Sequence, residues 1–435
     1  MEAVEHRRTL VELARPVYFS LLANVAAGII NTLWVARLGG EAVAAVAVAT
    51  NVENVLLGVA LVFGSGTTVL VAHARGAQDP GALRAAVRGG VGLCALLVPV
   101  VAGGGWLLRE DVARLALGDG GGAVRLAVAY FGVSLPGMAV FYAQQLVDGI
   151  LKGAGDTRTP MRLALLTNGL ILVLDPLLIH GYGVVGAAVS TVAARLVALA
   201  AGLRVLRRDP LLAGAVGVGS PWAVARTGLP MAADFTVRQT GALALVAVVA
   251  RLGVTAVAAY AVAYKILYVA TMAFYAVRQA ASIHTAHRRG AGHDERGAVG
   301  RQAVVVSGAV GLVAALLFLA LAPWLMRAFG APHDVTVEGA LFLRCVGPYL
   351  VLLAGFIALG GVFEGSGGAP KVLRVTLLGT LLQLPCAAWL SGLWGLAGVC
   401  AAMGAAMAVQ CGCLLVMARR AAAQEAAPTD WSRAA

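Results

Sequence analysis

Charged side chains are scarce in this sequence of 435 residues, because only 12% of them are Asp, Glu, Lys or Arg. A soluble globular protein has about 25%, since its surface must be solvated. Aromatic side chains are also few, at 6%, whereas 60% of the residues are hydrophobic and the mean hydropathy is +0.86. This composition sets aside soluble enzymes and soluble nucleic-acid binders, and it predicts an integral membrane protein.

The sequence also lacks the usual signatures of metal, cofactor or covalent chemistry. It has no paired Cys or His with metal-ligand spacing, no phosphate-binding loop and no Ser/His/Asp set. Its six cysteines all lie in apolar segments, where small packing residues are the expected role. An intramembrane prenyltransferase would need clustered carboxylates, and here they are scattered. We therefore expect neither an enzyme nor a resident metal or cofactor.

Long apolar runs dominate what is present. A membrane-spanning helix needs about 20 apolar residues, and charged or Pro/Gly punctuation separates twelve such runs. The first sixteen residues are charged and lack a short apolar core with a cleavage site, so they are not expected to be a removable signal peptide. The expected spans are 14–37, 43–72, 90–108, 126–149, 162–180, 183–203, 224–250, 256–282, 303–325, 339–363, 373–391 and 395–417.

The basic residues indicate how the spans are oriented. With the N-terminus inside, 23 of the 33 Lys and Arg residues fall on the cytoplasmic side and six fall outside. An excess of Lys and Arg marks cytoplasmic loops. This predicts a multi-pass protein of the bacterial plasma membrane with both termini cytoplasmic. The net charge of +12 is then a property of these loops and not a surface for nucleic acid.

The chain repeats itself. Three motifs recur in the same order and at a nearly constant spacing: Val35–Gly39 with Val249–Gly253, Arg75–Ala77 with Arg289–Ala291, and Lys152–Gly155 with Glu364–Gly367. Each half would hold six helices, and an even number gives the halves parallel topology. We expect an N-terminal lobe at 1–210 and a C-terminal lobe with a short polar tail at 211–435. Two such bundles are typical of alternating-access transporters, here expected to be monomeric.

Several segments resemble the multidrug and toxic compound extrusion (MATE) family. They are GAGDTRTP at 153–160, LDPLLI at 174–179, GVVGAAVST at 183–191, Arg37–Gly40 and Gly290–Arg296. The resemblance covers nearly the whole chain and implies a twelve-helix, two-lobe antiporter in the bilayer. It would expel small organic molecules using a proton or sodium gradient. The DinF-like branch is most similar, because the carboxylates that other branches carry in the C-terminal lobe are not evident.

The resemblance also implies a cation-coupling site in the N-terminal lobe. Asp175 carries over clearly, with coupling or bracing of a helix kink as its two possible roles. Pro176 follows it and removes a backbone hydrogen bond, which leaves a carbonyl available. Pro16 resembles the kink proline of the first helix. Asn31 stands where the family usually has Asp.

The rest of the family's cation site is altered here. Ile171 replaces a common Asn, with Asn168 almost one turn earlier, and Thr191 is near the expected threonine within a shift of two residues. A sodium ion needs several oxygen ligands, whereas a proton needs only a buried carboxyl group, since burial favours its neutral form. Proton coupling is therefore predicted, with sodium coupling and uncoupled transport as open alternatives.

Other intramembrane charges are functional candidates, because charges in a bilayer are costly. Glu53 is either a second protonation site or the ion-pair partner of Arg195. Asp234 and Arg238 have the helical spacing of a self-satisfied pair, with substrate contact as the alternative. Four glutamines are expected to line the cavity or bridge helices: Gln144, Gln145, Gln239 and Gln383.

These observations predict a secondary active antiporter that exports organic or drug-like small molecules by alternating access and is driven by proton influx. The alternative is a lipid-linked saccharide flippase of the same superfamily, which generally has extra helices and a more basic cavity. The identity and the charge of the substrate do not follow from the sequence.

Overall fold

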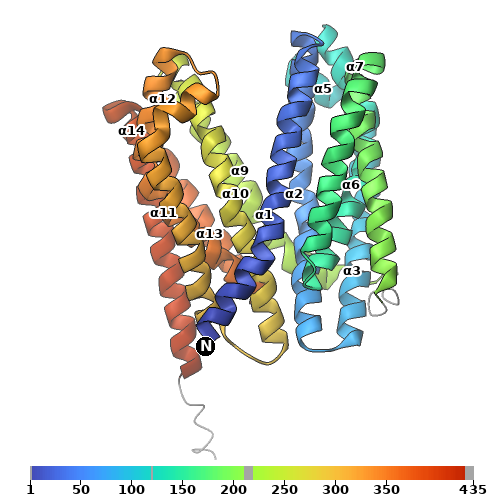
Figure 1. Ribbon diagram of the computed structural model, residues 1–435, viewed down its shortest axis with the longest axis vertical. Coiled ribbons are helices and arrows are strands. Elements are labelled where there is room, and N and C mark those ends of the chain that lie inside the picture. Colours follow the sequence, from blue (N-terminus) through green and yellow to red (C-terminus); the bar gives the residue numbers. More distant parts are fainter. Residues whose placement is uncertain (1, 119–120, 210–218, 427–435) are drawn as a thin grey trace, which may run out of the picture. The chain divides into compact units, whose positions relative to one another are not determined.

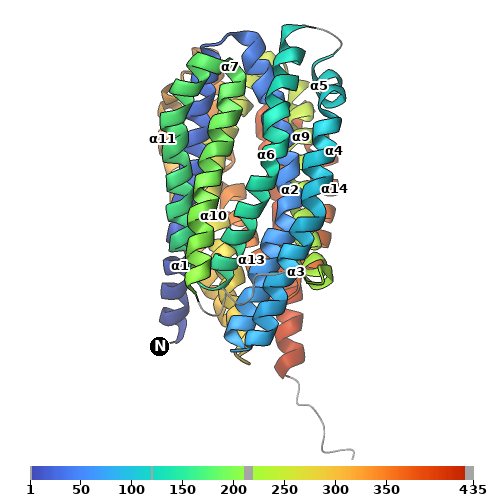
Figure 2. The ribbon, with the colours of Figure 1, turned by 90° about the vertical axis from the view of Figure 1, so that its right-hand side faces the viewer.

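The computed structural model describes residues 2–118, 121–209 and 219–426, and within them every regular element is helical. Figures 1 and 2 show that long helices of the same half of the chain, such as the two arms of α7, lie side by side. The helices are α1 (Glu2–Ala36), α2 (Gly40–Gly76), α3 (Pro80–Val98), the π-helical turn η1 (Pro99–Gly103), α4 (Gly104–Leu107), α5 (Arg109–Leu117), α6 (Gly122–Gly153), α7 (Arg158–Arg208), α9 (Trp222–Ala250), α10 (Val254–Gly290), α11 (Arg296–Ala328), α12 (His333–Cys345), α13 (Gly347–Gly365) and α14 (Ala369–Ala426).

The chain forms two compact units. The N-terminal unit comprises Glu12–Thr236 and Ala286–Asp294, and the C-terminal unit comprises Met1–Val11, Val237–Thr285 and Glu295–Ala435. The predicted lobe boundary between residues 210 and 211 lies outside the described residues.

The residue ranges of the two units are discontinuous because a short end of each of two helices belongs to the other unit. The first turns of α1 belong to the C-terminal unit, where His6 Nδ1 lies 3.0 Å from His284 Nε2 and His6 Nε2 lies 3.3 Å from a carboxylate oxygen of Glu295. The end of α10 belongs to the N-terminal unit, where Gly290 packs against the backbone of His73.

In the N-terminal unit, α6 packs against α2, α3 and α7. Close approach of α2 and α6 depends on glycine, because a Cβ at Gly149 would meet the backbone carbonyl of Gly64 and one at Gly153 would meet that of Thr68. Figure 2 shows the two arms of α7 side by side. Tight packing of small residues is the usual means of helix association in membranes, where lipid is as apolar as a leucine side chain.

The C-terminal unit repeats this packing. In it, α13 packs against α11 and α14, which Figure 1 shows grouped together. A Cβ at Gly361 would meet the backbone of Arg278, and one at Gly365 would meet that of Ser282. These four residues are the repeat equivalents of the four that make the corresponding contacts in the N-terminal unit. The repeat read from the sequence is therefore present in the packing.

Two kinks reconcile the helix count with the twelve predicted spans. Ten helices of the described residues are long and apolar enough to cross a membrane. Two of these, α7 and α14, contain one non-helical glycine each, Gly183 at φ 58° and ψ −136° and Gly395 at φ 57° and ψ −135°. Each therefore supplies two of the twelve spans, and the all-helical membrane fold is confirmed.

The helices differ from the predicted spans mainly at their ends. They continue beyond the apolar runs, as α1 does from Glu2 through the charged N-terminal segment, because polar residues outside the apolar layer can also be helical. The short helix α5 (Arg109–Leu117), with charged residues near its start and in its last turn, was not predicted. Hydropathy does not register such a polar helix.

Candidate functional site

Asp175 lies on the first arm of α7 and is fully buried, with 0% exposure. Its Oδ2 accepts a hydrogen bond of 2.8 Å from Asn31 Nδ2 on α1. Ser190, on the second arm of α7, interacts with the same carboxyl group, although Asp175 Oδ1 and Ser190 Oγ form no hydrogen bond of ordinary geometry. The kink at Gly183 folds the second arm back, so residues fifteen positions apart meet. Asp175 thus joins α1 to both arms of α7.

A second carboxyl group lies in the same unit. Glu53 on α2 interacts electrostatically with Arg195 on α7 and with the hydroxyl of Ser134 on α6. Arg195 places its guanidinium carbon 4.5 Å from the ring centroid of Phe141. Among the described residues, Glu53 forms no direct salt bridge. Glu53 and Arg195 therefore interact over a longer distance than a contact pair would.

Tyr130 on α6 lies near both carboxyl groups. It is 6% exposed, and Glu53, Arg195 and Asp175 are all within electrostatic range of its hydroxyl. We define the N-terminal polar cluster as these seven residues: Asn31, Glu53, Tyr130, Ser134, Asp175, Ser190 and Arg195.

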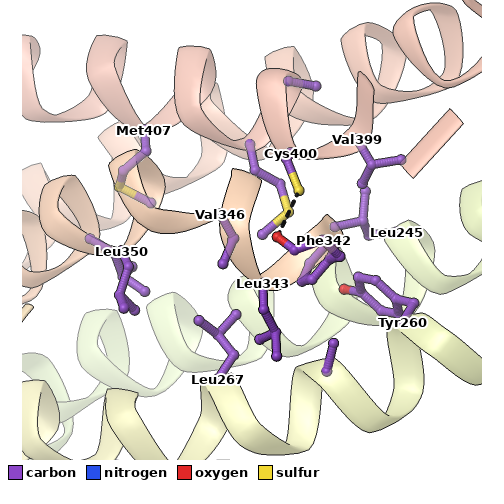
Figure 3. Close-up of a cluster of buried hydrophobic side chains, with 14 of the residues drawn as sticks. Leu245, Tyr260, Leu267, Phe342, Leu343, Val346, Leu350, Val399, Cys400 and Met407 are labelled. Carbon is purple, nitrogen blue, oxygen red and sulfur yellow. Dashed lines mark hydrogen bonds between the residues drawn. The ribbon is translucent and has the colours of Figure 1, made fainter. Parts of the chain in front are cut away.

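The same positions of the C-terminal unit are all apolar. The spacing between Val35 and Val249 gives the equivalents for α1 and α2, and the spacing between Lys152 and Glu364 gives those for α6 and α7. The seven equivalent residues are Leu245, Leu267, Phe342, Val346, Ala387, Ala402 and Met407. All of them belong to one cluster of buried hydrophobic residues, and Figure 3 shows five of them packed together.

The scaffold therefore folds with apolar side chains at every one of these positions. The N-terminal polar cluster is an addition to the fold. Buried polar groups at membrane depth are added at a cost in stability, and they point to function.

Two residues predicted for the cation site make their hydrogen bonds with groups other than Asp175. Asn168 Nδ2 donates a hydrogen bond of 2.9 Å to Asn24 Oδ1 on α1. Thr191 Oγ1 donates to the carbonyl of Ala187 on its own helix, at 3.0 Å. Ile171 is 9% exposed and packs as an apolar side chain. The hydroxyl near Asp175 is that of Ser190, which sequence reasoning missed by one position.

Both predicted kink prolines lie inside helices. Pro16 is buried inside α1, and Pro176 is inside α7 directly after Asp175. Because proline has no backbone N–H, the carbonyl of Leu172, four residues earlier, loses its helical donor. That carbonyl lies within one turn of the carboxyl-bearing residue.

Sequence reasoning also missed a buried ion pair and a buried carboxyl group. Arg278 on α10 donates from Nε to Glu364 Oε2 on α13 at 3.1 Å and from Nη2 to Oε1, and the two residues are 8% and 5% exposed. Arg278 is one of the 23 Lys and Arg residues assigned to the cytoplasmic side from the sequence, and the structure places it as a buried residue of α10. Asp148 on α6 has a buried Oδ1 without a hydrogen bond and lies one turn before Lys152. Glu364 and Asp148 both lie near glycines of the repeated motifs, and no sequence pattern around them indicates that they are buried.

In the C-terminal unit, α9 places Arg238 at a cavity of about 120 Å³. Its guanidinium carbon lies 6.0 Å from the ring centroid of Phe356. Asp234, one turn earlier on α9 and within the range of the N-terminal unit, is 1% exposed. Two of the four predicted glutamines, Gln239 and Gln383, line this cavity.

Comparisons with known proteins agree with this architecture. The MatE family model matches residues 16–177 and 230–389. The starts of the two matched segments are spaced as Val35 and Val249 are, and their ends are spaced as Lys152 and Glu364 are. The family match therefore covers both halves of the chain and follows its internal repeat.

Relatives and solved structures extend the match. The chain is similar to a probable multidrug resistance protein NorM of Thermotoga maritima, 25% identical over 87% of this chain and 84% of that protein. It is also similar to a probable multidrug resistance protein YpnP of Bacillus subtilis, 23% identical over 90% of each. A multidrug resistance MATE transporter solved in an outward-facing conformation superimposes with a TM-score of 0.89, at 24% identity and 97% coverage of both chains. The chain belongs to the MatE family, and it is a multi-pass membrane transporter of the MATE type.

Proposed function

We propose that this transporter exports organic small molecules in exchange for protons, and that Asp175 is the group that takes up and releases the proton. The observation that carries the proposal is the contrast between the two units. Asp175 and its neighbours form a polar cluster around a fully buried carboxyl group in one unit, whereas the repeat-equivalent positions of the other unit are filled by Ala387 and six further apolar residues.

The surroundings of Asp175 favour a proton over a sodium ion. A desolvated metal cation needs several oxygen ligands, and alkaline-earth sites in proteins typically use six or more. Asn31 presents its amide N–H to Asp175, Thr191 directs its hydroxyl to its own helix, and Ile171 offers no oxygen. A proton requires only the carboxyl group itself, and a buried aspartate surrounded by hydroxyl and amide groups can hold one.

The exchange then follows alternating access. With the transporter open to the outside, Asp175 takes up a proton while the cargo leaves. Neutralisation weakens the hold of the Asn31 amide on Asp175, because hydrogen bonds to charged groups are roughly twice as strong as neutral ones. The contact between α1 and α7 therefore differs between the two protonation states, and the difference biases the rearrangement. Deprotonation toward the cytoplasm resets the site.

Glu53 and Arg195 set the electrostatic environment of this exchange. Tyr130 lies near both of them and near Asp175, which places the two carboxyl groups in one cluster. We assign Arg195 the role of balancing Glu53 and assign the proton exchange to Asp175. Asn168 and Thr191, which are bonded elsewhere, have no direct part.

We further propose that both termini are cytoplasmic, that the protein acts as a monomer, and that it belongs to the DinF-like branch of the family. The first rests on the distribution of basic residues, and the last on the apolar residues at the C-terminal equivalents of the N-terminal polar cluster. In the described part of that unit, the buried acid Glu364 is paired with Arg278.

The proposal is tested with purified protein in liposomes. Liposomes with an acidic lumen and neutral exterior should accumulate ethidium, a permanently charged organic cation that acidic compartments do not trap by protonation. A sodium gradient at uniform pH should give no accumulation. Asp175→Asn should abolish pH-driven uptake, whereas Asp111→Asn, at an exposed aspartate of α5 in the same unit, should retain it. Uptake by Asp175→Asn at the wild-type rate, or uptake driven by sodium alone, would refute the proposal.

A further inference from the structure

One face of α6 is polar along most of its length. Successive helical residues are turned by about 100° around the axis. By that spacing, five side chains fall within a sector about 60° wide: Tyr130, Ser134, Phe141, Gln145 and Asp148. We call this sector the polar face of α6. Four of its five side chains are polar, and the guanidinium carbon of Arg195 lies 4.5 Å from the centroid of the fifth, the Phe141 ring.

The polar face starts at the N-terminal polar cluster. Tyr130, its first residue, lies near Asp175 and Glu53. Arg195 of α7 lies near Tyr130 and also over the Phe141 ring, so polar groups continue along the face beyond the cluster. The face therefore leads from the proposed site of proton uptake toward the last turns of α6.

The scaffold does not require a polar face at this place. By the spacing between Lys152 and Glu364, the first four residues of the face correspond to apolar residues: Phe342, Val346, Leu353 and Ile357. All four belong to the cluster of buried hydrophobic residues in the C-terminal unit, and Asp148 corresponds to Gly360. The polar face is therefore, like the N-terminal polar cluster, an addition to the fold.

Two polar atoms of the face have no partner among the described residues. Ser134 is 5% exposed, and its Oγ makes no hydrogen bond of ordinary geometry with them. The same holds for the buried Oδ1 of Asp148. Buried polar atoms are normally bonded either to protein or to ordered water, so these two atoms are positions at which water can bind along the face.

Asp148 ends the polar face near the end of α6. Among the described charged residues of α6 and of α2, α3 and α7 packed against it, Lys152 is the one whose charge acts on Asp148. The two form no salt bridge in the described part of the chain, so the carboxyl group is not held by a fixed partner. At about 1.5 Å per residue, Asp148 lies about 21 Å along the helix from Ser134. That separation is too long for one direct proton transfer, and a path along it needs a second carrier.

We propose that Asp148 is this second proton carrier and that it passes the proton from Asp175 to the cytoplasm along the polar face of α6. The relay rests on the proposed export function and on the proposed cytoplasmic location of the termini. Protonated Asp175 gives its proton to water beside Tyr130 and Ser134, and water along the face carries it to the Asp148 carboxylate. Asp148 then gives the proton to cytoplasmic water. Both carboxyl groups are left ionised, and one proton has crossed.

Initial rates of ethidium uptake into liposomes with an acidic lumen test the relay. Asp148→Asn should lower the rate at least about tenfold, because a positioned proton-transfer group contributes about a hundredfold or more. Asp148→Glu keeps a carboxyl group and should keep most of the rate. Binding of ethidium to the detergent-purified Asp148→Asn protein should equal that of the wild type, since the relay acts on the proton and not on the cargo. Asp111→Asn is the matched control at an exposed aspartate.

A small weak acid separates a proton carrier from a structural residue. Azide in the external buffer exchanges protons as hydrazoic acid and can replace a missing carboxyl group near the surface. It should raise the rate of Asp148→Asn severalfold when each rate is compared with that of the wild type in the same buffer. Azide should not restore uptake by Asp175→Asn, because that variant lacks the group that couples the proton to the cargo.

Gln145→Ile tests the face without altering either carboxyl group. It introduces the residue that the C-terminal unit has at the equivalent position, Ile357, and it interrupts the polar face just before Asp148. The variant should fold, as measured by its melting temperature, and its rate of pH-driven uptake should fall severalfold.

The outcomes separate the relay from the export function. Uptake at the wild-type rate by a folded Asp148→Asn protein would overturn the relay. An equal loss in Asp148→Asn and Asp148→Glu without rescue by azide would give Asp148 a structural role and overturn it as well. Should Asp148→Asn not fold, Gln145→Ile decides, and its uptake at the wild-type rate would reject the relay. Uptake that depends on Asp175 but not on Asp148 rejects the relay alone, whereas uptake insensitive to Asp175→Asn rejects the export proposal and the relay with it.

Discussion

At the scale of single residues, the site around Asp175 shows that an error of one position in the sequence changes which hydroxyl group is assigned to the carboxyl group. Asp175 and Asn31 could be placed from their motifs, and the structure joins them by a hydrogen bond. Thr191 was the expected hydroxyl, but Ser190 lies at the carboxyl group. Adjacent helical residues point about 100° apart, so one position moves a side chain to another face. No sequence pattern resolves that difference.

Replacing Asn31 with Leu tests the hydrogen bond to Asp175. Leu occupies the equivalent position of the C-terminal unit, as Leu245, so Asn31→Leu should still fold, with a lower melting temperature because the buried Asp175 carboxyl loses its donor. The lost bond to a charged group is worth about 1.5–3 kcal/mol, and we expect pH-driven ethidium uptake to fall about tenfold or more. Initial rates in liposomes and melting curves measure the two effects. Asn168→Leu, whose side chain bonds to Asn24, is the control, and an equal loss of rate in both variants would contradict the account.

The buried pair of Arg278 and Glu364 yields a prediction about stability. Removing one partner leaves an uncompensated buried charge, which costs about 3–5 kcal/mol. Glu364→Leu should therefore lower the melting temperature strongly. The double variant Arg278→Met with Glu364→Leu should regain most of the loss, because an apolar pair of similar volume is tolerated. A double variant no more stable than Glu364→Leu would show that the pair is not the source of the stability.

At the scale of helices, the apolar runs predicted the spans but not the way in which four of them are joined. In α7 and α14 the chain reverses at a single glycine, Gly183 or Gly395, in a conformation that L-residues rarely adopt. Three residues later, Gly186 and Gly398 lie against the carbonyls of Leu178 and Leu390. The sequence shows these glycines as part of a repeat, yet hydropathy cannot tell that they allow a helix to fold back on itself.

This close approach predicts a selective sensitivity to alanine. A Cβ at Gly186 would meet the carbonyl of Leu178, whereas a Cβ at Gly181 has no heavy atom within 4 Å. Gly186→Ala should destabilise the protein by about 1–3 kcal/mol, the usual cost of overpacking, and Gly181→Ala should leave its stability nearly unchanged. Thermal unfolding followed by intrinsic fluorescence compares the two. Equal melting temperatures would contradict the described hairpin of α7.

At the scale of the whole molecule, duplication followed by divergence explains which features could be predicted from the sequence. The repeat spacing, the number of spans and the membrane class follow from short motifs and composition, because both halves must satisfy the same packing and the same solvent. The cavity at Arg238 and the pair of Arg278 and Glu364 could not be predicted. They depend on which faces of α10 and α13 meet, and apolar helices give little sequence signal for that choice.

The distribution of basic residues predicts the sidedness of the protein in the membrane. Single cysteines placed in a cysteine-free variant report it through a membrane-impermeant thiol reagent. Arg289→Cys, at the end of α10, should be labelled only after cells are opened, and Gly118→Cys, after α5, should be labelled on intact cells. Labelling of both positions on intact cells, or the reversed pattern, would overturn the proposed cytoplasmic location of the termini.

The most direct test of the account measures the proton itself. Liposomes with an acidic lumen and a trapped pH-sensitive dye receive ethidium on the outside. If Asp175 exchanges a proton for cargo, the lumenal pH of wild-type liposomes should rise when ethidium is added, and that of Asp175→Asn liposomes should not. An equal rise of pH in liposomes containing the Asp175→Asn variant would contradict the central claim.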